Sequence, residues 1–319
     1  MPLLPDPYYR RRKRHCSLPG RNDTKGQGLH RAPSFRQDKG GSRRVSFRQT
    51  RIMISCVIPV RNRSEIVLLA IESALNQGNM VREIIVVDDA STDDTKEAVK
   101  KAFPQVKIVT TPKRIGPGPA RNLGVQNSTG EIIMFLDSDD IWHNNHCKLL
   151  LEAMDPGFHA AYGITKNRNL RDGSSFFIPE SDHLISGECL NELFRWCFMV
   201  PSSFAVTRKA FMEVGGFEAF SPGEDWFFFL KLARRYPFAA VPEIITLRFL
   251  HEGSISCRFF DKKSAGRMLL KLKKFAADYR CSQEEIARID NMIEFTERYG
   301  ATCQSVQDWY LSMKGKGLV

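Results

Sequence analysis

The sequence lacks any apolar run of the roughly 18 residues that would be needed to span a bilayer. A basic stretch, RRRKRH, lies at residues 10–15, but no apolar stretch follows it, so the pattern does not fit a secretory signal. The eight cysteines are scattered without a C-x-x-C pair, which argues against a zinc or redox motif and for reduced, packed thiols. The simplest interpretation is a soluble cytoplasmic protein.

Excess charge is also lacking once the first 51 residues are set aside. Residues 1–51 hold 14 Lys and Arg side chains against 3 Asp, whereas the remaining 268 residues hold 33 of each sign. This arm is rich in Arg, Gly, Pro, Ser and Gln and has no apolar periodicity, which predicts disorder. It is interpreted as a solvated tail, with an arm for RNA or acidic lipid as the alternative. A third hypothesis is that the native chain starts at Met53. We do not expect nucleic acid to be a partner of the balanced body.

The first part of the body alternates between two patterns. Short apolar runs predict buried strands, and the segments between them have helical spacing, with Ser64 as the expected N-cap of the first helix and Gly78 past its end. The strands are expected at 52–60, 83–89, 106–111 and 131–137, and the helices at 64–78, 92–103 and 117–130. This alternation predicts a parallel sheet, which binds ligands beyond the carboxyl ends of its strands.

The pattern loosens after about residue 155. We expect strands at 159–167 and 243–250, helices at 187–196 and 224–236, and a strand, a short helix and a turn within 198–217. Helices are expected from residue 261 onward, the first at 262–280. The apolar positions of this basic segment share one helical face, which predicts core packing, with a membrane-surface role as the alternative.

Three acidic clusters follow apolar runs or open a helix: Asp88-Asp89, the group at 137–140, and Glu224-Asp225. Each alone would fit a turn or an N-cap. The first two are expected to end neighbouring parallel strands and so to converge on one rim of the sheet. Gathered carboxylates suit a hard divalent cation such as Mg²⁺ or Mn²⁺, which pairs with substrate phosphates.

Six motifs then follow one another in a recognisable order: VIPVRN (57–62), IIVVDDASTDDT (84–95), ARNLGV (120–125), FLDSDD (135–140), GEDWFF (223–228) and HEGSIS (251–256). Over residues 53–256 they resemble family two of the inverting glycosyltransferases. The resemblance implies the A-type glycosyltransferase fold, an α/β domain with a Rossmann-like, mostly parallel sheet flanked by helices. The catalytic domain would cover 52–257, divided into a nucleotide-binding half (52–140) and an acceptor half (141–257). A helical extension would follow at 258–319, after the arm of 1–51.

The resemblance also implies roles on the nucleotide side. Asp89 would hold the base of a nucleotide-sugar, with Asp88 supporting it, and Pro59, Val60, Arg61 and Asn62 would line the base. Many relatives carry an aromatic residue where this chain has Arg61, although a guanidinium can also stack on a base. Arg121 and Asn122 would close over the nucleoside. Asp137, Ser138 and Asp139 form the D-x-D motif, with Asp139 as the direct metal ligand and Asp137 near metal, ribose and sugar. Asp140 is expected to cap a following helix.

On the acceptor side, Asp225 matches the family's catalytic base, and Glu224 would lie beside it near the acceptor. His251 resembles the late histidine that reaches the metal or the diphosphate. Trp226 is expected to pack its helix against the sheet, with a position facing the acceptor as the alternative. A base so placed would take the proton of the acceptor hydroxyl in an inverting transfer.

The resulting hypothesis is a hexosyltransferase-type enzyme dependent on Mn²⁺ or Mg²⁺. It would move a sugar from a nucleotide-sugar, with UDP as the expected nucleotide, to a saccharide or lipid-linked acceptor in cell-surface polysaccharide or glycolipid synthesis. Peripheral contact with the anionic inner face of the membrane is a further hypothesis. A phosphatase would place its D-x-D after the first strand, and a nucleotidyltransferase needs a glycine-rich loop that PVRNRSE lacks. The alternative is a catalytically silent interaction protein whose arm binds RNA or anionic membrane.

Overall fold

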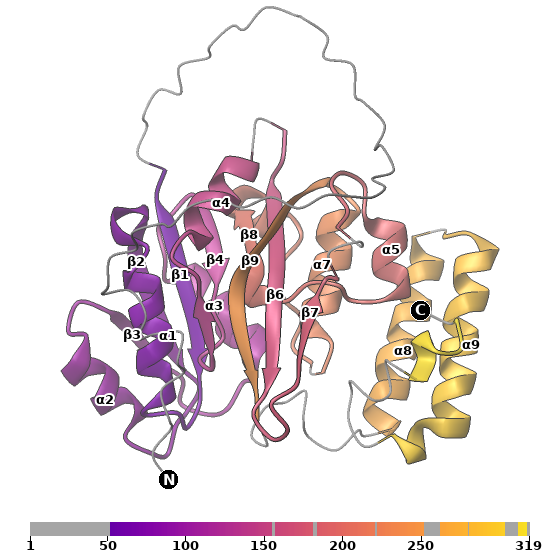
Figure 1. Ribbon diagram of the computed structural model, residues 1–319, viewed down its shortest axis with the longest axis horizontal. Helices are drawn as coiled ribbons and strands as arrows, with labels where there is room; N and C mark the ends of the chain where they lie inside the picture. Colours follow the sequence, from indigo (N-terminus) through magenta and orange to yellow (C-terminus); the bar gives the residue numbers. More distant parts are fainter. Residues whose placement is uncertain are drawn as a thin grey trace, which may run out of the picture. The chain divides into compact units, whose positions relative to one another are not determined.

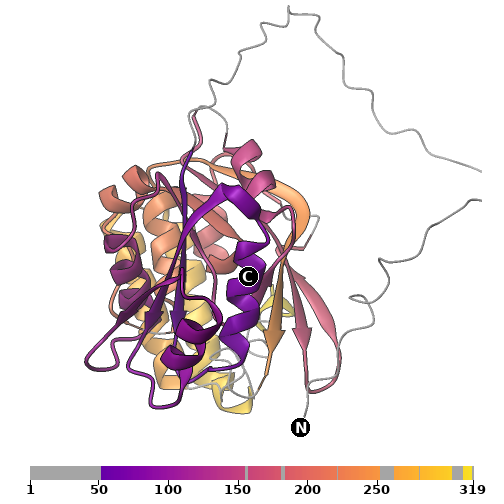
Figure 2. The ribbon, with the colours of Figure 1, turned by 90° about the vertical axis from the view of Figure 1, so that its left-hand side faces the viewer.

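The computed structural model describes residues 52–154, 157–180, 184–220, 222–251, 262–279, 281–303 and 312–317. The predicted arm of residues 1–51 and the part of the HEGSIS motif after His251 lie outside these ranges. The described body is built on a nine-stranded sheet with helices on both faces (Figures 1 and 2). The predicted α/β class is therefore confirmed.

The first four strands are parallel and lie in the order β3-β2-β1-β4. Their bounds are β1 Ile54–Val60, β2 Val81–Asp88, β3 Lys107–Thr110 and β4 Ile132–Phe135. The expectation that the strands before Asp88 and Asp137 are neighbours was wrong, because β1 separates β2 from β4. The chain adds β2 and β3 on one side of β1 and then returns to place β4 on the other. Such a reversal opens a crevice at the carboxyl ends of the strands, where ligands bind in sheets of this kind.

Helices α1 (Ile66–Leu75), α2 (Thr95–Ala102) and α3 (Pro117–Gln126) connect these strands. Alternate residues of β1 serve opposite faces of the sheet: Val57 belongs to the core that includes α3, and Cys56 to the core that includes α1 and α2. A Cβ at Gly124 would come within 2.3 Å of Val57 Cγ1, so glycine allows the close approach of α3 to the sheet. The predicted N-cap of α1 at Ser64 was wrong, because α1 begins after Glu65 and has no side-chain cap.

The second half of the body extends the same sheet through β8, β6, β9 and β5, and β7 pairs with β6. β8 is antiparallel to β4, and β5 is antiparallel to β9, so parallel pairing dominates only the first half. The bounds are β5 Asp140–Trp142, α4 His146–Ala153, β6 Ala160–Asn169, β7 Ser175–Ile178, α5 Leu190–Arg195, β8 Phe204–Thr207, α6 Arg208–Glu213, α7 Glu224–Ala233 and β9 Phe238–Leu250. Short 3₁₀ turns lie at Gly78–Met80, Pro201–Ser203 and Gly300–Thr302. The pattern did not predict β5 or β7.

An aromatic core joins the second half to the first. The ring of Phe217 stacks on that of Phe228 in α7 at a centroid distance of 4.2 Å, and both contact Phe135 of β4 at 5.1 and 6.3 Å. Buried aromatic pairs of this kind add roughly 0.5–1.5 kcal/mol each beyond their area. This packing fixes the segment that leads into α7 against the end of β4.

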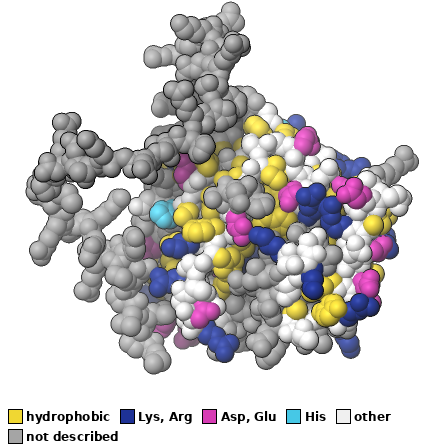
Figure 3. All heavy atoms as spheres, turned by 45° about the vertical axis from the view of Figure 1, so that its right-hand side comes forward, with side chains coloured by type: hydrophobic (Ala, Val, Ile, Leu, Met, Phe, Trp, Pro, Cys, Tyr) yellow, Lys and Arg dark blue, Asp and Glu magenta, His cyan; other side chains and the backbone are white. Residues whose placement is uncertain are grey.

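The C-terminal helices α8 (Lys262–Asp278) and α9 (Gln283–Tyr299) pack into the same core. Leu269, Leu272 and Ala276 of α8 are fully buried there, so the predicted core packing of this apolar face is confirmed. Side chains of both charge signs are interspersed over the face turned forward in Figure 3, and they do not gather in one basic patch.

Candidate active site

The loops after β1 and β2 are cross-linked at the rim of the sheet. Asn62 has a left-handed backbone (φ 53°), its Oδ1 accepts from Thr92 N at 2.8 Å, and its backbone N–H donates to Ser91 Oγ at 2.9 Å. Arg61 donates from one guanidinium nitrogen to the carbonyl oxygens of Asp89 and Ala90 at 2.9 and 2.8 Å. These contacts hold the two loops as one rigid edge before any ligand binds.

Asp88 and Asp89 are buried and serve the same edge. Asp88 Oδ1 accepts from Ser91 N at 3.0 Å. Asp89 accepts from the backbone N–H groups of Ile115 at 2.7 Å and Gly116 at 2.9 Å, at the entry to α3. Its expected contact with a nucleotide base stays a prediction, and a base would have to share this carboxylate with the loop.

Arg121 of α3 connects the D-x-D motif to the start of α7. Its Nη2 lies 2.6 Å from Asp137 Oδ1, and its Nη1 lies 3.3 Å from Glu224 Oε1. The guanidinium is buried and also lies over the Phe217 ring, 5.1 Å from the centroid. Burial lowers the pKa of Arg121, but the charges of Asp137 and Glu224 outweigh it and raise that pKa above its ordinary value. The two carboxylates therefore share one permanent positive charge.

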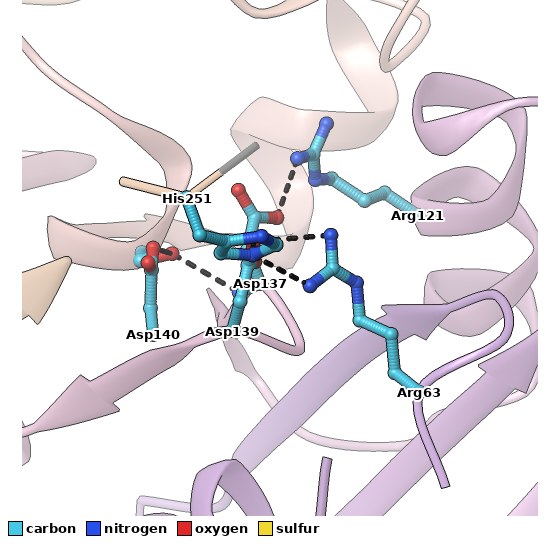
Figure 4. A network of polar contacts seen from close by, with 7 residues as sticks. Arg63, Arg121, Asp137, Asp139, Asp140 and His251 are labelled. Atoms are coloured by element: carbon cyan, nitrogen blue, oxygen red, sulfur yellow. Dashed lines mark hydrogen bonds and ion pairs between the residues drawn. The ribbon is translucent and has the colours of Figure 1, made fainter. Parts of the chain in front are cut away.

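Asp139 faces a second arginine and a histidine (Figure 4). Its Oδ2 lies 3.3 Å from Arg63 Nη2 and 3.1 Å from His251 Nε2. Burial alone would raise the pKa of Asp139, but the His251 contact and the charges of Arg63 and Arg248 outweigh it and lower that pKa. The positive groups that compensate the D-x-D carboxylates in this structure are therefore side chains of the chain itself.

Asp140 does not cap a helix, so that prediction was wrong. It opens β5, is 2% exposed, and its Oδ2 accepts from Ser202 Oγ at 2.5 Å. Ser202 Oγ also accepts from Asp137 N at 3.0 Å, so one buried hydroxyl fixes both ends of the D-x-D turn. Burial, with the Asp139 charge next, raises the pKa of Asp140 well above its ordinary value. The helix was misplaced because the chain first pairs with β9 and turns into α4 only at His146.

Glu224 and Asp225 form the first turn of α7, after Gly223 in the left-handed region (φ 100°). Glu224 is buried and turned to Arg121, whereas Asp225 is half-buried and its Oδ1 accepts from Trp226 N at 2.8 Å. Burial, and then the Asp225 charge, raises the pKa of Glu224 to about 7 against the opposing charge of Arg121. Trp226 is 6% exposed, and its Nε1 donates to Leu193 O of α5. Its side chain is therefore packed in the core as predicted, but this contact is with α5 and not with the sheet.

Other predicted site residues are buried or are bonded to neighbouring backbone. Pro59 is buried within β1, and Ser138 is 5% exposed. Asn122 donates to Phe217 O at 2.8 Å and accepts from Phe217 N at 2.9 Å, so it positions the segment before α7. Its expected closure over a nucleoside stays a prediction.

Arg63 and Ser202 were not among the residues predicted from the sequence. Arg63 directly follows three predicted residues in the VRNR stretch (60–63), so its place just after the first strand was an available signal. Ser202 lies in VPSS before β8 and carried no signal, because its contacts with Asp137 and Asp140 span more than 60 residues.

The site offers part of a ligand set for a hard divalent cation. Within the described ranges, no three His, Cys, Asp or Glu side chains converge as a complete ligand set. Asp139 Oδ2 and His251 Nε2 do converge, 3.1 Å apart. One carboxylate and one imidazole fit Mn²⁺ or Mg²⁺, because such ions in phosphate-binding sites draw further ligands from water and substrate. Asp137 is instead turned to Arg121.

Comparison with known proteins identifies this arrangement. The family model described as Glycosyl transferase family 2 matches residues 55–215, which is half of the chain and includes the D-x-D motif. The chain belongs to glycosyltransferase family 2. The predicted family is thereby confirmed, and Asp137, Asp139 and Arg121 lie within the matched residues.

This family 2 chain is similar to chondroitin synthase of Escherichia coli, with 31% identity over 215 residues, covering 66% of this chain and 30% of that protein. The matches span only 26% to 30% of the length of the first curated relatives.

Two solved structures share the A-type fold. TarS of S. aureus in complex with UDP-GlcNAc aligns with a TM-score of 0.58 at 18% identity, covering 78% of this chain and 73% of that one. Mannosyltransferase PcManGT from Pyrobaculum calidifontis, in complex with GDP-Man and Mn²⁺, aligns with a TM-score of 0.55 at 18% identity, covering 83% and 79%. The predicted fold is thus confirmed. No helix among the described residues is long and apolar enough to cross a membrane.

Proposed function

We propose that the chain is an inverting glycosyltransferase that moves a sugar from a nucleotide-sugar to an acceptor hydroxyl and depends on Mn²⁺ or Mg²⁺. The observation that carries this proposal is the bridge through Arg121, which joins Asp137 of the D-x-D motif to Glu224 beside the proposed base. It couples the carboxylates expected to hold the donor to those expected to receive the acceptor. A transferase needs both sets in one site, so that the acceptor hydroxyl can reach the anomeric carbon of the bound donor.

Asp139 and His251 are the residues that would hold the cation. When bound, the cation would supply positive charge that stabilises the leaving diphosphate. Ser202 would keep Asp137 and the turn to Asp139 in place, because its hydroxyl fixes Asp137 N and the Asp140 carboxylate together. Asp137 would then face the ribose and sugar from its position on Arg121.

Asp225 would act as the base. Its carboxylate is half-buried at the start of α7, where an acceptor can approach, whereas Glu224 is buried against Arg121. In an inverting transfer the acceptor hydroxyl attacks the anomeric carbon, the bond to the diphosphate breaks, and the hydroxyl proton passes to this carboxylate. Glu224 would set the charge around Arg121 and so the position of Asp137.

We propose UDP as the nucleotide, and cell-surface polysaccharide or glycolipid synthesis as the setting. The support is similarity only: one structural neighbour was solved with UDP-GlcNAc, another with GDP-Man, and one relative is a chondroitin synthase. The hexosyl nature of the sugar is part of the same proposal. The acceptor would be a saccharide or a lipid-linked glycan.

Peripheral membrane contact stays part of the proposal, but only through charged side chains. The apolar face of α8 is buried in the core, so it does not serve insertion into a bilayer. The contact would instead use exposed basic side chains of α8, namely Lys263, Arg267, Lys271 and Lys274. The competing hypothesis, a silent protein acting through its basic arm, concerns residues outside the described ranges.

The proposal is tested by calorimetric titration of UDP, GDP and dTDP into the protein with and without Mn²⁺. One diphosphate should bind in a metal-dependent way to wild type and to Asp278→Ala, whose exposed carboxylate in α8 serves as the matched control. Asp139→Ala should lose that binding. Binding that ignores both Mn²⁺ and Asp139, or no binding at all, would contradict the proposal.

A further inference from the structure

We infer that Arg63 holds Asp139 and His251 in place before the cation binds, and that on binding its guanidinium passes from these residues to the donor diphosphate. The inference rests on the proposed function and adds a residue to it. Arg63 lies in the loop after β1, Asp139 follows β4, and His251 follows β9. Its guanidinium contacts both, and the three side chains are each only 18% to 24% exposed (Figure 4).

The backbone of Arg63 is held at the rim of the sheet, and its guanidinium extends from there to Asp139 and His251. The backbone N–H of Arg63 donates to Thr95 Oγ1 at 2.9 Å, at the first residue of α2. The preceding residue, Asn62, is bound to the loop after β2. A long side chain anchored in this way can exchange one anionic partner for another across the rim without any change in the backbone.

The contacts at His251 Nε2 are mutually incompatible. This single ring nitrogen lies 2.8 Å from Arg63 Nη1, which is always a donor, and 3.1 Å from Asp139 Oδ2, which is an acceptor when ionised. If Nε2 carries a proton it faces the arginine donor, and if it does not it faces the carboxylate lone pair. One of the two contacts is unfavourable in either tautomer.

A cation between Asp139 Oδ2 and His251 Nε2 would resolve this conflict, because both atoms would then direct lone pairs at one positive centre. The guanidinium of Arg63 now supplies that charge from one side. With the cation in place, the guanidinium of Arg63 would lie beside a second positive charge and would be repelled from its present position. Phosphate oxygens match the guanidinium fork as carboxylate oxygens do, so the donor diphosphate can take the place of Asp139 as the partner of Arg63.

The inference predicts effects of opposite sign, which a purely structural role would not give. In Arg63→Gln, Mn²⁺ added alone should bind about 2- to 5-fold more tightly, because Asp139 no longer exchanges a partly exposed ion pair for the metal. With Mn²⁺ saturating, UDP should bind roughly 10-fold more weakly, because a charged hydrogen-bond donor to the diphosphate is gone. The free Mn²⁺ signal in electron paramagnetic resonance measures the first effect, and calorimetry measures the second.

Two further variants make the test decisive. Arg114→Gln removes the same charge from an exposed loop position and should leave both affinities unchanged. Arg63→Lys keeps the charge without the fork, so it should show both effects at reduced size, and it replaces Arg63→Gln if that variant does not fold. Weaker or unchanged Mn²⁺ binding in the Arg63 variants, while wild type binds both ligands, would overturn this inference alone. A wild type that binds neither Mn²⁺ nor UDP would overturn the proposed function and the inference with it.

Discussion

The two halves of the sheet present their functional side chains in different ways. In the N-terminal half (residues 52–140), the rim is held by hydrogen bonds between loops, such as those from Arg61 to the carbonyls of Asp89 and Ala90. In the C-terminal half (residues 141–251), the start of α7 is held by ring packing of Phe217 and Phe228. One rim is polar and built from backbone groups, and the other is set by an apolar core beneath it.

This difference suits the two substrates of the proposed reaction. Hydrogen bonds between loops would give the proposed nucleotide site a fixed geometry. A helix start supported by a packed core would keep one carboxylate in position for the proposed acceptor. Arg121 lies between the halves and contacts Asp137 in one and Glu224 in the other.

The largest difference between the roles of the two halves is expected in the turnover of Asp225→Asn. The substitution removes the proposed base and keeps the size of the side chain, so turnover should fall by roughly 10²- to 10⁴-fold. Because the residues proposed to hold the nucleotide and the cation lie outside α7, the affinity for UDP with Mn²⁺ should change little. Sugar transfer by chromatography and UDP binding by calorimetry measure the two quantities on the same preparation.

Asp278→Asn is the matched control for this variant, since Asp278 is an exposed carboxylate of α8. Its turnover should equal that of wild type. If Asp225→Asn retained full turnover, the base would have to be sought elsewhere. An equal loss of UDP affinity and turnover would show that nucleotide binding and catalysis are not assigned to separate halves.

The same division explains how far the sequence alone predicts this molecule. Each of β1 to β4 contains an apolar run, short in β3, and segments with helical spacing separate them, so every one of them could be predicted. β5 and β7 have three and four residues, and they exist only because β9 and β6 pair with them, which no local pattern records. For the site, motifs supplied Asp137, Asp139 and Glu224.

What the motifs could not supply was the pairing. The motifs led us to expect that Asp137, Asp139 and Glu224 would contact a bound metal, donor or acceptor. In the structure Arg121, Arg63 and His251 are their partners, across 16 to 112 residues of sequence. Such partners are set by the strand order, and the reversal after β3 was not visible in the periodicity. Propensity and spacing are local, whereas charge compensation at a sheet rim is a property of the assembled fold.

A smaller effect, specific to the C-terminal half, is expected in how the free energy of unfolding of Glu224→Gln depends on pH. Burial, with the Asp225 charge second, raises the pKa of Glu224 from 4.5 to about 7 in the folded protein. A raised pKa means that the folded state binds the proton more tightly, so wild type loses stability as pH rises from the unfolded value through the folded one. The glutamine variant does not titrate here. Its free energy of unfolding relative to wild type should therefore increase between pH 5 and pH 8 by roughly 3 kcal/mol, at about 1.4 kcal/mol per pKa unit.

Urea unfolding at four pH values between 5 and 8 measures this slope. The loss of the contact with Arg121 adds an offset that is the same at every pH, so only the slope reports on Glu224. Glu243→Gln, at an exposed position of β9, should show no slope. A difference between Glu224→Gln and wild type that does not vary with pH would contradict a raised pKa.

The smallest effect concerns the polar edge of the N-terminal half, through Asn62. Asn62→Gly keeps the left-handed backbone and the N–H bond to Ser91 but loses the side-chain bond to Thr92 N, which should cost about 1 kcal/mol of unfolding free energy. Asn62→Ala loses the same bond and also strains a backbone at φ 53°, so it should cost about 1 kcal/mol more.

Ala90→Gly is the converse control, because it relieves a left-handed alanine at φ 52° and should leave stability near that of wild type or above it. Denaturant unfolding of the three variants decides the matter. If Asn62→Ala were no worse than Asn62→Gly, the left-handed turn would carry no strain, and the rigidity assigned to this edge would rest on the Arg61 contacts alone.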